Sequence, residues 1–133
     1  MRVFFDAHVL VSAFTARGLC ADLFKGTITS CTLVTSDPLL AELRRILSDK
    51  FGATPKDLDE VMGVVEEDAD KAPVGDRLDI RIKERDDIRI LSSAIHGKAD
   101  NFVTGYKEVL ALGNLGTMRI LSPRDFWAVL RRN

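Results

Sequence analysis

The feature that most constrains the fold is a short apolar run at residues 3–5, which stops at Asp6 and is followed by a second apolar segment from Val9 to Phe14. Such a run predicts a strand buried on both faces of a parallel sheet. A carboxylate therefore stands where a central strand ends. Ligands of open α/β sheets bind at the carboxyl ends of strands. Two interpretations stay open at this point, because Asp6 can also cap the helix that follows.

The rest of the chain alternates between strand-like and helix-like patterns. The further predicted strands are residues 31–35, 78–82, 101–104 and 117–121, with helical patterns between them. The acidic run 66–70 is interpreted as a solvated helix end, and residues 113–116 as a loop. This alternation predicts an α/β fold, a three-layer α/β/α sandwich around a mostly parallel sheet. A length of 133 residues with 46% apolar residues predicts one domain over residues 1–133.

Two further acids lie beside apolar helix faces. Glu42 projects about 40° beyond Ile46, at the edge of an apolar stripe. Asp87 falls within about 20° of the middle of the apolar arc of its helix, whereas Asp86 points to the edge of that arc or beyond. A surface ion pair between Glu42 and Arg45 remains an alternative, as does a capping role for Asp87.

Together, Asp6, Glu42 and Asp87 suggest a chemical hypothesis. All three can lie over the carboxyl edge of a parallel sheet, where close carboxylates raise one another's pKa and a cation offsets their repulsion. Oxygen-only ligands favour hard ions such as Mg²⁺ or Mn²⁺, which can activate water for attack on a phosphodiester. The net charge of −1 carries no global basic signature, so nucleic-acid binding would need local basic residues or metal ions.

Several other residues are interpreted structurally. Cys20 and Cys31 lack metal-ligand spacing and are expected to be buried free thiols. His96 is expected on the surface, and Trp127 is expected to pack its helix onto the core. No apolar run has membrane length and no signal peptide is recognised, so the chain is expected to be cytoplasmic and to contact no membrane.

Five segments in order resemble the PIN-domain family, in particular VapC-like toxin components of toxin–antitoxin pairs. They are residues 5–13 (FDAHVLVSA), 40–47 (LAELRRIL), 86–91 (DDIRIL), 97–105 (GKADNFVTG) and 120–126 (ILSPRDF). The resemblance spans essentially the whole chain and implies a five-stranded parallel sheet. It also implies Mg²⁺- or Mn²⁺-dependent cleavage of RNA, with Asp6, Glu42 and Asp87 as metal ligands. A small antitoxin partner and a homodimer are implied as well.

The chain departs from the family pattern at two positions. His8 replaces the usual Asn, and Tyr106 stands where a fourth acid usually follows the Thr104-Gly105 pair. Asp100 begins a strand and belongs to the opposite edge of the sheet, whereas Glu108 lies on the correct side. His8, Ser12, Thr104 and Tyr106 are the accessory candidates around the acids. The basic residues that could steer a phosphate are Arg17, Arg44, Lys98 and Lys107.

Other functions fit less well. A degenerate PIN module that binds RNA or a protein without cutting is the main alternative, favoured by His8 and Tyr106 and opposed by the three retained acids. A phosphatase with Asp6 as nucleophile would need a second acid two residues later, where this chain has His8. Dinucleotide binding is unsupported, because no glycine-rich turn follows the first strand.

Overall fold

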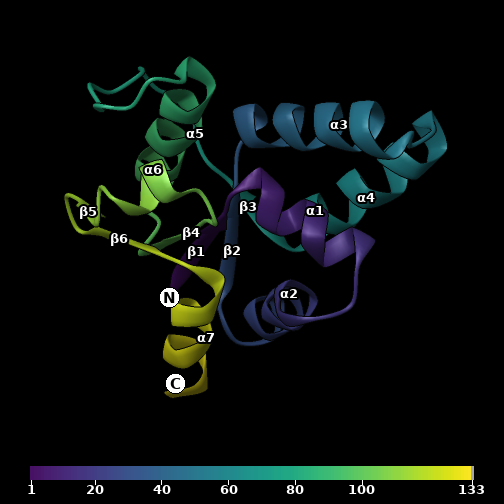
Figure 1. The fold of residues 1–133 in the computed structure, drawn as a ribbon, viewed down its shortest axis with the longest axis horizontal. Helices are drawn as coiled ribbons and strands as arrows, with labels where there is room; N and C mark the ends of the chain where they lie inside the picture. The colour runs from purple at the N-terminus through teal and green to yellow at the C-terminus, as the bar shows by residue number, and fades with distance from the viewer. Residues whose placement is uncertain (133) are drawn as a thin grey trace.

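The structure, a computed structural model, describes residues 1–132. Helices and strands alternate along the chain, with the two termini near the same side of the molecule (Figure 1). The elements in order are β1 (Arg2–Phe5), α1 (Ala7–Thr15), α2 (Leu19–Ser30), β2 (Thr32–Thr35), α3 (Asp37–Phe51), α4 (Pro55–Asp68), β3 (Ala69–Lys71), α5 (Arg85–His96), β4 (Asn101–Val103), α6 (Lys107–Leu110), β5 (Asn114–Leu115), β6 (Met118–Leu121) and α7 (Pro123–Arg132).

The sheet has the strand order β3-β2-β1-β4-β6-β5. All neighbours are parallel except β5 and β6, which form an antiparallel pair. The predicted α/β fold with a mostly parallel sheet is confirmed. The expected number of five strands is wrong, because the sheet formed by residues 1–132 has six. The additional strand is the two-residue β5, which lies within residues 113–116, where a loop was predicted.

The predicted strand at residues 78–82 is also wrong, and its place at the sheet edge is taken by β3. Residues Ala69 to Lys71 pair with β2, although residues 66–70 were expected to end a helix in solvent. The 78–82 segment lies against α5 instead, where the Leu78 N–H donates to Ser92 Oγ at 2.9 Å and Ile80 is buried. The alternation of polar and apolar residues in the 78–82 segment therefore reflects packing against α5 and not strand pairing.

β1 is the centre of the sheet and of the core. Phe4 stacks on Phe102 of the neighbouring β4, with ring centroids 5.4 Å apart. Phe5 meets Phe126 of α7 edge to face at 6.1 Å. All four rings are buried, so they fix both the pairing of the central strands and the position of the C-terminal helix.

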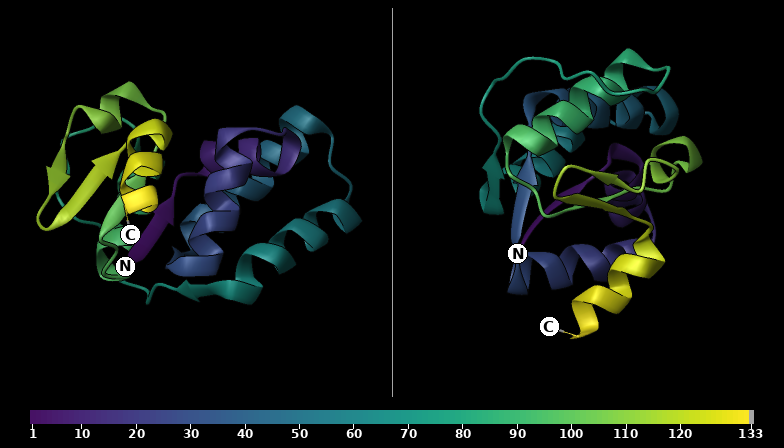
Figure 2. Two further views of the ribbon diagram at one scale, coloured as in Figure 1. Left: turned by 90° about the horizontal axis from the view of Figure 1, so that it is seen from below. Right: turned by 90° about the vertical axis from the view of Figure 1, so that its left-hand side faces the viewer.

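The connections change direction at β1 and β4. The helices that follow β1 and β2 lead outward to β2 and β3, whereas α6 leads from β4 the other way, to the antiparallel pair β5 and β6 (Figure 2). With right-handed crossovers, α5 covers the opposite face of the sheet from α1 to α4. Adjacent strands whose connections diverge leave a crevice at their carboxyl ends. In this chain Asp6 and Thr104 follow the carboxyl ends of these two strands.

Two smaller expectations concern the cysteines and membrane helices. Cys20 and Cys31 are free, as predicted, but half-buried rather than buried. Partial burial raises the pKa of the Cys20 thiol.

Within residues 1–132 no single helix has the length and apolarity to span a bilayer. Only α1 and α2 taken together meet that measure, and they are bent by 104°.

Candidate functional site

Asp6 is held in place by both neighbouring strands. Its backbone N–H donates to the Val103 carbonyl at 2.9 Å, and the residue caps α1. Oδ1 accepts the Ala7 N–H at 2.8 Å, and Oδ2 accepts the hydroxyl of Thr104 at 2.7 Å. Capping and a position at the crevice are therefore compatible. Burial raises the pKa of this carboxyl, and the hydrogen bonds from Thr104 and Ala7 counter part of that effect.

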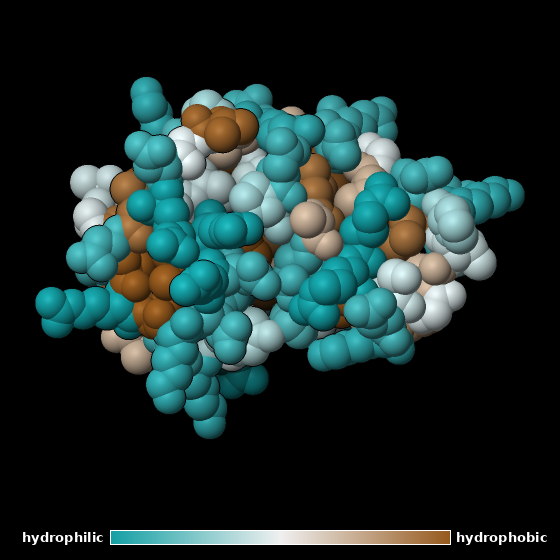
Figure 3. All heavy atoms as spheres, turned by 90° about the horizontal axis from the view of Figure 1, so that it is seen from above, coloured by the Kyte–Doolittle hydropathy of each residue, from teal (hydrophilic) through white to brown (hydrophobic). Residues whose placement is uncertain are grey.

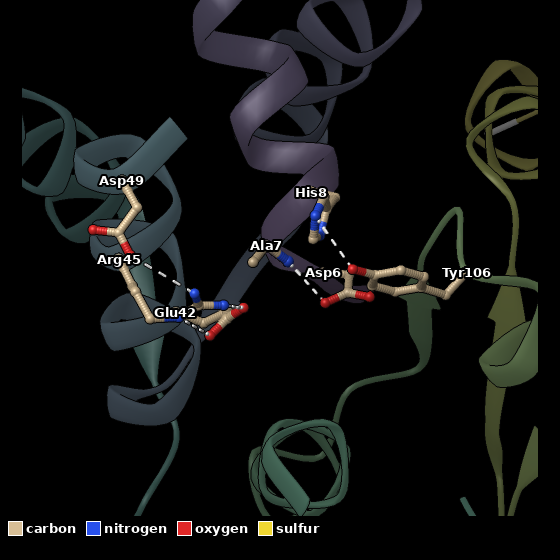
Figure 4. Close-up of polar contacts among 7 residues, drawn as sticks. All are labelled: Asp6, Ala7, His8, Glu42, Arg45, Asp49 and Tyr106. Atoms are coloured by element: carbon tan, nitrogen blue, oxygen red, sulfur yellow. Dashed lines mark hydrogen bonds and ion pairs between the residues drawn. The ribbon is translucent and has the colours of Figure 1, made fainter. Parts of the chain in front are cut away.

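A ring of contacts surrounds Asp6. Thr104 Oγ1 accepts the backbone N–H of Tyr106 at 3.1 Å. The Tyr106 hydroxyl lies 3.2 Å from His8 Nε2 (Figure 4). The rings of His8 and Tyr106 meet edge to face, with centroids 4.9 Å apart. The two positions at which the sequence departs from the family pattern are therefore in direct contact. Burial, and then the charge of Asp6, raises the pKa of the Tyr106 phenol.

Glu42 projects from α3 toward Asp6 but is paired with Arg45 (Figure 4). Arg45 donates through Nε to Oε2 at 3.1 Å and through Nη2 to Oε1 at 2.6 Å. The ion pair that the sequence left as an alternative is therefore present. The hydrogen bond and charge of Glu42 raise the pKa of the exposed Arg45 guanidinium.

Asp87 lies in the first turn of α5 and is half-buried. Its pKa is raised to about 6, first by burial and then by the negative charges of Asp6, Glu84, Glu42 and Glu108. A cavity of about 340 Å³ joins Asp87 with Glu84, Glu42 and Glu108, whereas Asp6 is not among its lining residues. Its lining residues are Glu42, Arg45, Glu84, Asp86, Asp87, Tyr106, Glu108 and Val109. We call it the acidic cavity.

The acids surround this cavity without forming a closed ligand set. Among residues 1–132, no group of three or more His, Cys, Asp or Glu side chains is arranged to hold a metal ion. Glu42 is turned to Arg45, and Glu108 Oε1 accepts the Lys83 N–H at 3.0 Å. The donor set nevertheless suits a hard cation, because it offers only carboxylate oxygens under mutual repulsion. One conformational change, the release of Glu42 from Arg45, would free a further carboxylate.

The remaining candidates are more scattered. Ser12 is exposed on α1 and forms no side-chain hydrogen bond within the described residues. Asp100 accepts the Arg2 N–H at the opposite edge of the sheet, as expected. His96 is half-buried and donates to the Asp76 carbonyl, away from the acids. The acidic cavity includes none of these residues.

The four basic candidates do not gather at the acids. Arg17 follows the far end of α1, Lys98 precedes β4, and Arg44 lies 3.9 Å from Asp59. Only Lys107 begins an element at the crevice, next to Tyr106. Sequence reasoning missed Glu84, whose charge acts on Asp87; its position one turn before that acid was the available signal.

Comparison with known proteins gives two findings. The family model of the PIN domain matches residues 2–107. The fold is similar to that in "Crystal structure of VapBC2 from Rickettsia felis bound to a DNA fragment from their promoter", with a TM-score of 0.66 and 14% sequence identity over 92% of this chain and 98% of that chain. No curated protein sequence matches.

Proposed function

Because the chain belongs to the PIN domain family, we propose that residues 1–133 form one PIN domain that acts as a metal-dependent endoribonuclease, hydrolysing phosphodiester bonds in RNA. The observation that carries this proposal is the acidic cavity between α3, the start of α5 and α6. Burial, and then the negative charges of the neighbouring acids, raise the pKa of Asp87 to about 6. Such a cluster is unfavourable by itself and becomes favourable when a cation binds.

In this proposal Asp6, Glu42 and Asp87 hold one Mg²⁺ or Mn²⁺ ion. A bound ion of this type lowers the pKa of water and stabilises the negative charge that develops on a phosphodiester in the transition state. Thr104 is a positioning residue, because its hydroxyl fixes Oδ2 of Asp6. Glu42 exchanges Arg45 for the ion, which leaves the Arg45 guanidinium free to contact an RNA phosphate.

His8, Tyr106 and Ser12 are assigned lesser roles. The phenol of Tyr106 is partly exposed beside the acidic cavity, where it can donate to a phosphate oxygen or stack on a base. His8 orients that phenol through the 3.2 Å contact. Ser12 lies one helical turn and a half beyond Asp6, and its exposed hydroxyl is available to solvent or substrate.

The biological setting is proposed on the same basis. We propose a toxin component that acts in the cytoplasm and binds a small antitoxin, and that forms a homodimer. The Rickettsia felis structure is described as VapBC2 bound to a DNA fragment from its promoter, and the likeness of fold to it supports an antitoxin partner.

Cleavage of a mixed RNA panel with and without Mn²⁺ tests the proposal. We expect the native protein to cut only with the ion, and Asp6→Asn to lose cutting while keeping its circular dichroism spectrum. Glu42→Gln should behave like Asp6→Asn. Glu60→Gln, an exposed acid on α4, is the matched control and should cut normally. Full activity in folded Asp6→Asn would refute the assignment.

One observation favours a second function. Tyr106 supplies no carboxylate at the position where the family pattern has its fourth acid, and Glu42 is already neutralised by Arg45. A PIN module that binds RNA or a protein without cutting is consistent with both features. RNA binding without cleavage at any divalent ion concentration would favour this alternative.

A further inference from the structure

Two more cavities lead away from the acidic cavity between α3 and α5. A depression of about 220 Å³ shares Glu42, Arg45 and Asp86 with the acidic cavity. It shares Pro38 and Arg89 with a larger cavity of about 380 Å³. The three therefore form one continuous path, which we call the α3–α5 groove. The face of the molecule that carries α3 and α5 is largely hydrophilic and hollowed near its centre (Figure 3).

The 380 Å³ cavity combines positive charge with hydroxyl groups. Arg77 and Arg89 line it, and within residues 1–132 neither side chain forms an ion pair with an acid. The buried hydroxyls of Ser36 and Ser93 also line it and lie 2.7 Å apart. Asp37, the acid in its lining, is already paired with Lys71 at 3.1 Å. The available charge in this cavity is therefore positive.

The wall formed by residues 72–78 is fixed to the rest of the fold. The Ala72 N–H donates to the Thr35 carbonyl at 2.7 Å, and His96 Nε2 donates to the Asp76 carbonyl at 2.7 Å. A Cβ on Gly75 would lie 2.5 Å from the His96 ring, so only glycine allows this close approach. Together with the bond from Leu78 to Ser92 Oγ, these contacts make the cavity preformed. Binding there would require little ordering of the chain.

The apolar part of the same wall is exposed. Val74 is 94% exposed, and Pro73 and Pro38 line the cavity beside it. Proline and valine side chains at this rim give an apolar contact surface beside arginines that can contact a phosphate.

We propose that the α3–α5 groove binds the strand of single-stranded RNA that flanks the cleavage site, with Arg77 and Arg89 contacting backbone phosphates. This inference rests on the proposed function, because it takes the acidic cavity as the place where the strand is cut. RNA is favoured over a protein segment because the groove includes that cavity at one end and presents two arginines that form no ion pair within residues 1–132. The uniform negative backbone of RNA matches them.

Binding of a short fluorescein-labelled single-stranded RNA, followed by fluorescence anisotropy, tests this inference. All variants carry Asp6→Asn and are measured in EDTA, so that no cutting occurs. Arg77→Ala with Arg89→Ala should weaken binding at least about tenfold. It should also reduce the slope of log K against log salt by about 1.4, because two phosphate contacts are lost. Replacing both arginines with lysine should restore most of the slope.

The matched control is Arg119→Ala with Arg124→Ala, which removes the same charge from exposed positions on β6 and α7. It should bind RNA as tightly as the parent. Equal affinity of the Arg77/Arg89 variant and this control would overturn the inference and leave the groove to a protein partner. Cleavage is scored separately on chains with Asp6 intact. Arginine-dependent binding without cutting would refute only the nuclease, whereas cutting with arginine-independent binding would refute only the groove.

Discussion

Replacing Asp87 with asparagine should stabilise the metal-free protein at pH 7. In the folded chain, burial of the Asp87 carboxylate, and then the charges of nearby acids such as Asp6 and Glu84, raise its pKa from 3.8 to about 6. The ionised form is therefore less favourable in the folded state than in the unfolded chain. Asparagine keeps the shape of the side chain and removes the charge.

The pKa values set the size and the pH range of this effect. A rise from 3.8 to about 6 corresponds to at most about 3 kcal/mol at neutral pH. Because Asp87 is partly open to solvent, screening reduces this to about 1 kcal/mol. At pH values between 3.8 and about 6, Asp87 binds a proton in the folded state that it does not bind in the unfolded chain. The stability contributed by that proton is fully present below about pH 4 and is lost as the pH rises through 6.

Urea unfolding in EDTA at pH 7 and pH 4.5 measures the effect. We expect Asp87→Asn to raise the free energy of unfolding by about 1 kcal/mol at pH 7, and by much less at pH 4.5. Asp86→Asn, the exposed neighbour on α5, should change stability by less than about 0.5 kcal/mol. Adding Mn²⁺ should then stabilise the native protein more than Asp87→Asn. Equal stability of native and Asp87→Asn at pH 7, or a gain independent of pH, would refute the reasoning.

Three other substitutions test the surroundings of the acids. Thr104→Val removes the hydroxyl bound to Asp6 Oδ2 and should lower the free energy of unfolding by about 1–3 kcal/mol in urea. Tyr106→Asp adds a fourth carboxylate and should tighten Mn²⁺ binding about tenfold in calorimetry; weaker binding would show that the position does not face the ion. Phe102→Ala removes the ring stacked on Phe4 and should cost about 3–5 kcal/mol by the same urea assay.

The sequence alone was sufficient to predict the central strands of the sheet, but it did not predict the edge strands correctly. Residues 3–5 form an apolar run and residues 101–104 form a buried run with Phe102 and Val103 at its centre, and such runs have few alternatives to a central strand in a chain of this size. β3 has only three residues, two of them charged, and its pairing with β2 depends on where α4 ends. Whether such a short segment forms an edge strand depends on contacts with segments that are distant in the sequence. The local pattern therefore predicted a strand at residues 78–82 instead.

The positions of the site residues in the fold could be predicted from the sequence, but the conformations of their side chains could not. Helical projection brought Glu42 and Asp87 toward the carboxyl edge, since backbone geometry fixes side-chain direction to within one face. The side-chain rotamer of Glu42 depends on Arg45, and the fixed orientation of Asp6 depends on Thr104, which is 98 residues away. Arg77 and Arg89 could not be identified from the sequence as residues of one groove, because only the fold brings the 72–78 segment against α5.

The bond from residue 106 to Thr104 is made by the backbone N–H and not by the side chain. Any residue other than proline can therefore occupy position 106 and still hold the hydroxyl that orients Asp6. Over evolutionary time this position can exchange one chemical group for another while the first acid stays fixed. The replacement of an acid by Tyr106 would then have removed one contact to a substrate or ion without disturbing the architecture, and reversal would need only a single codon to change.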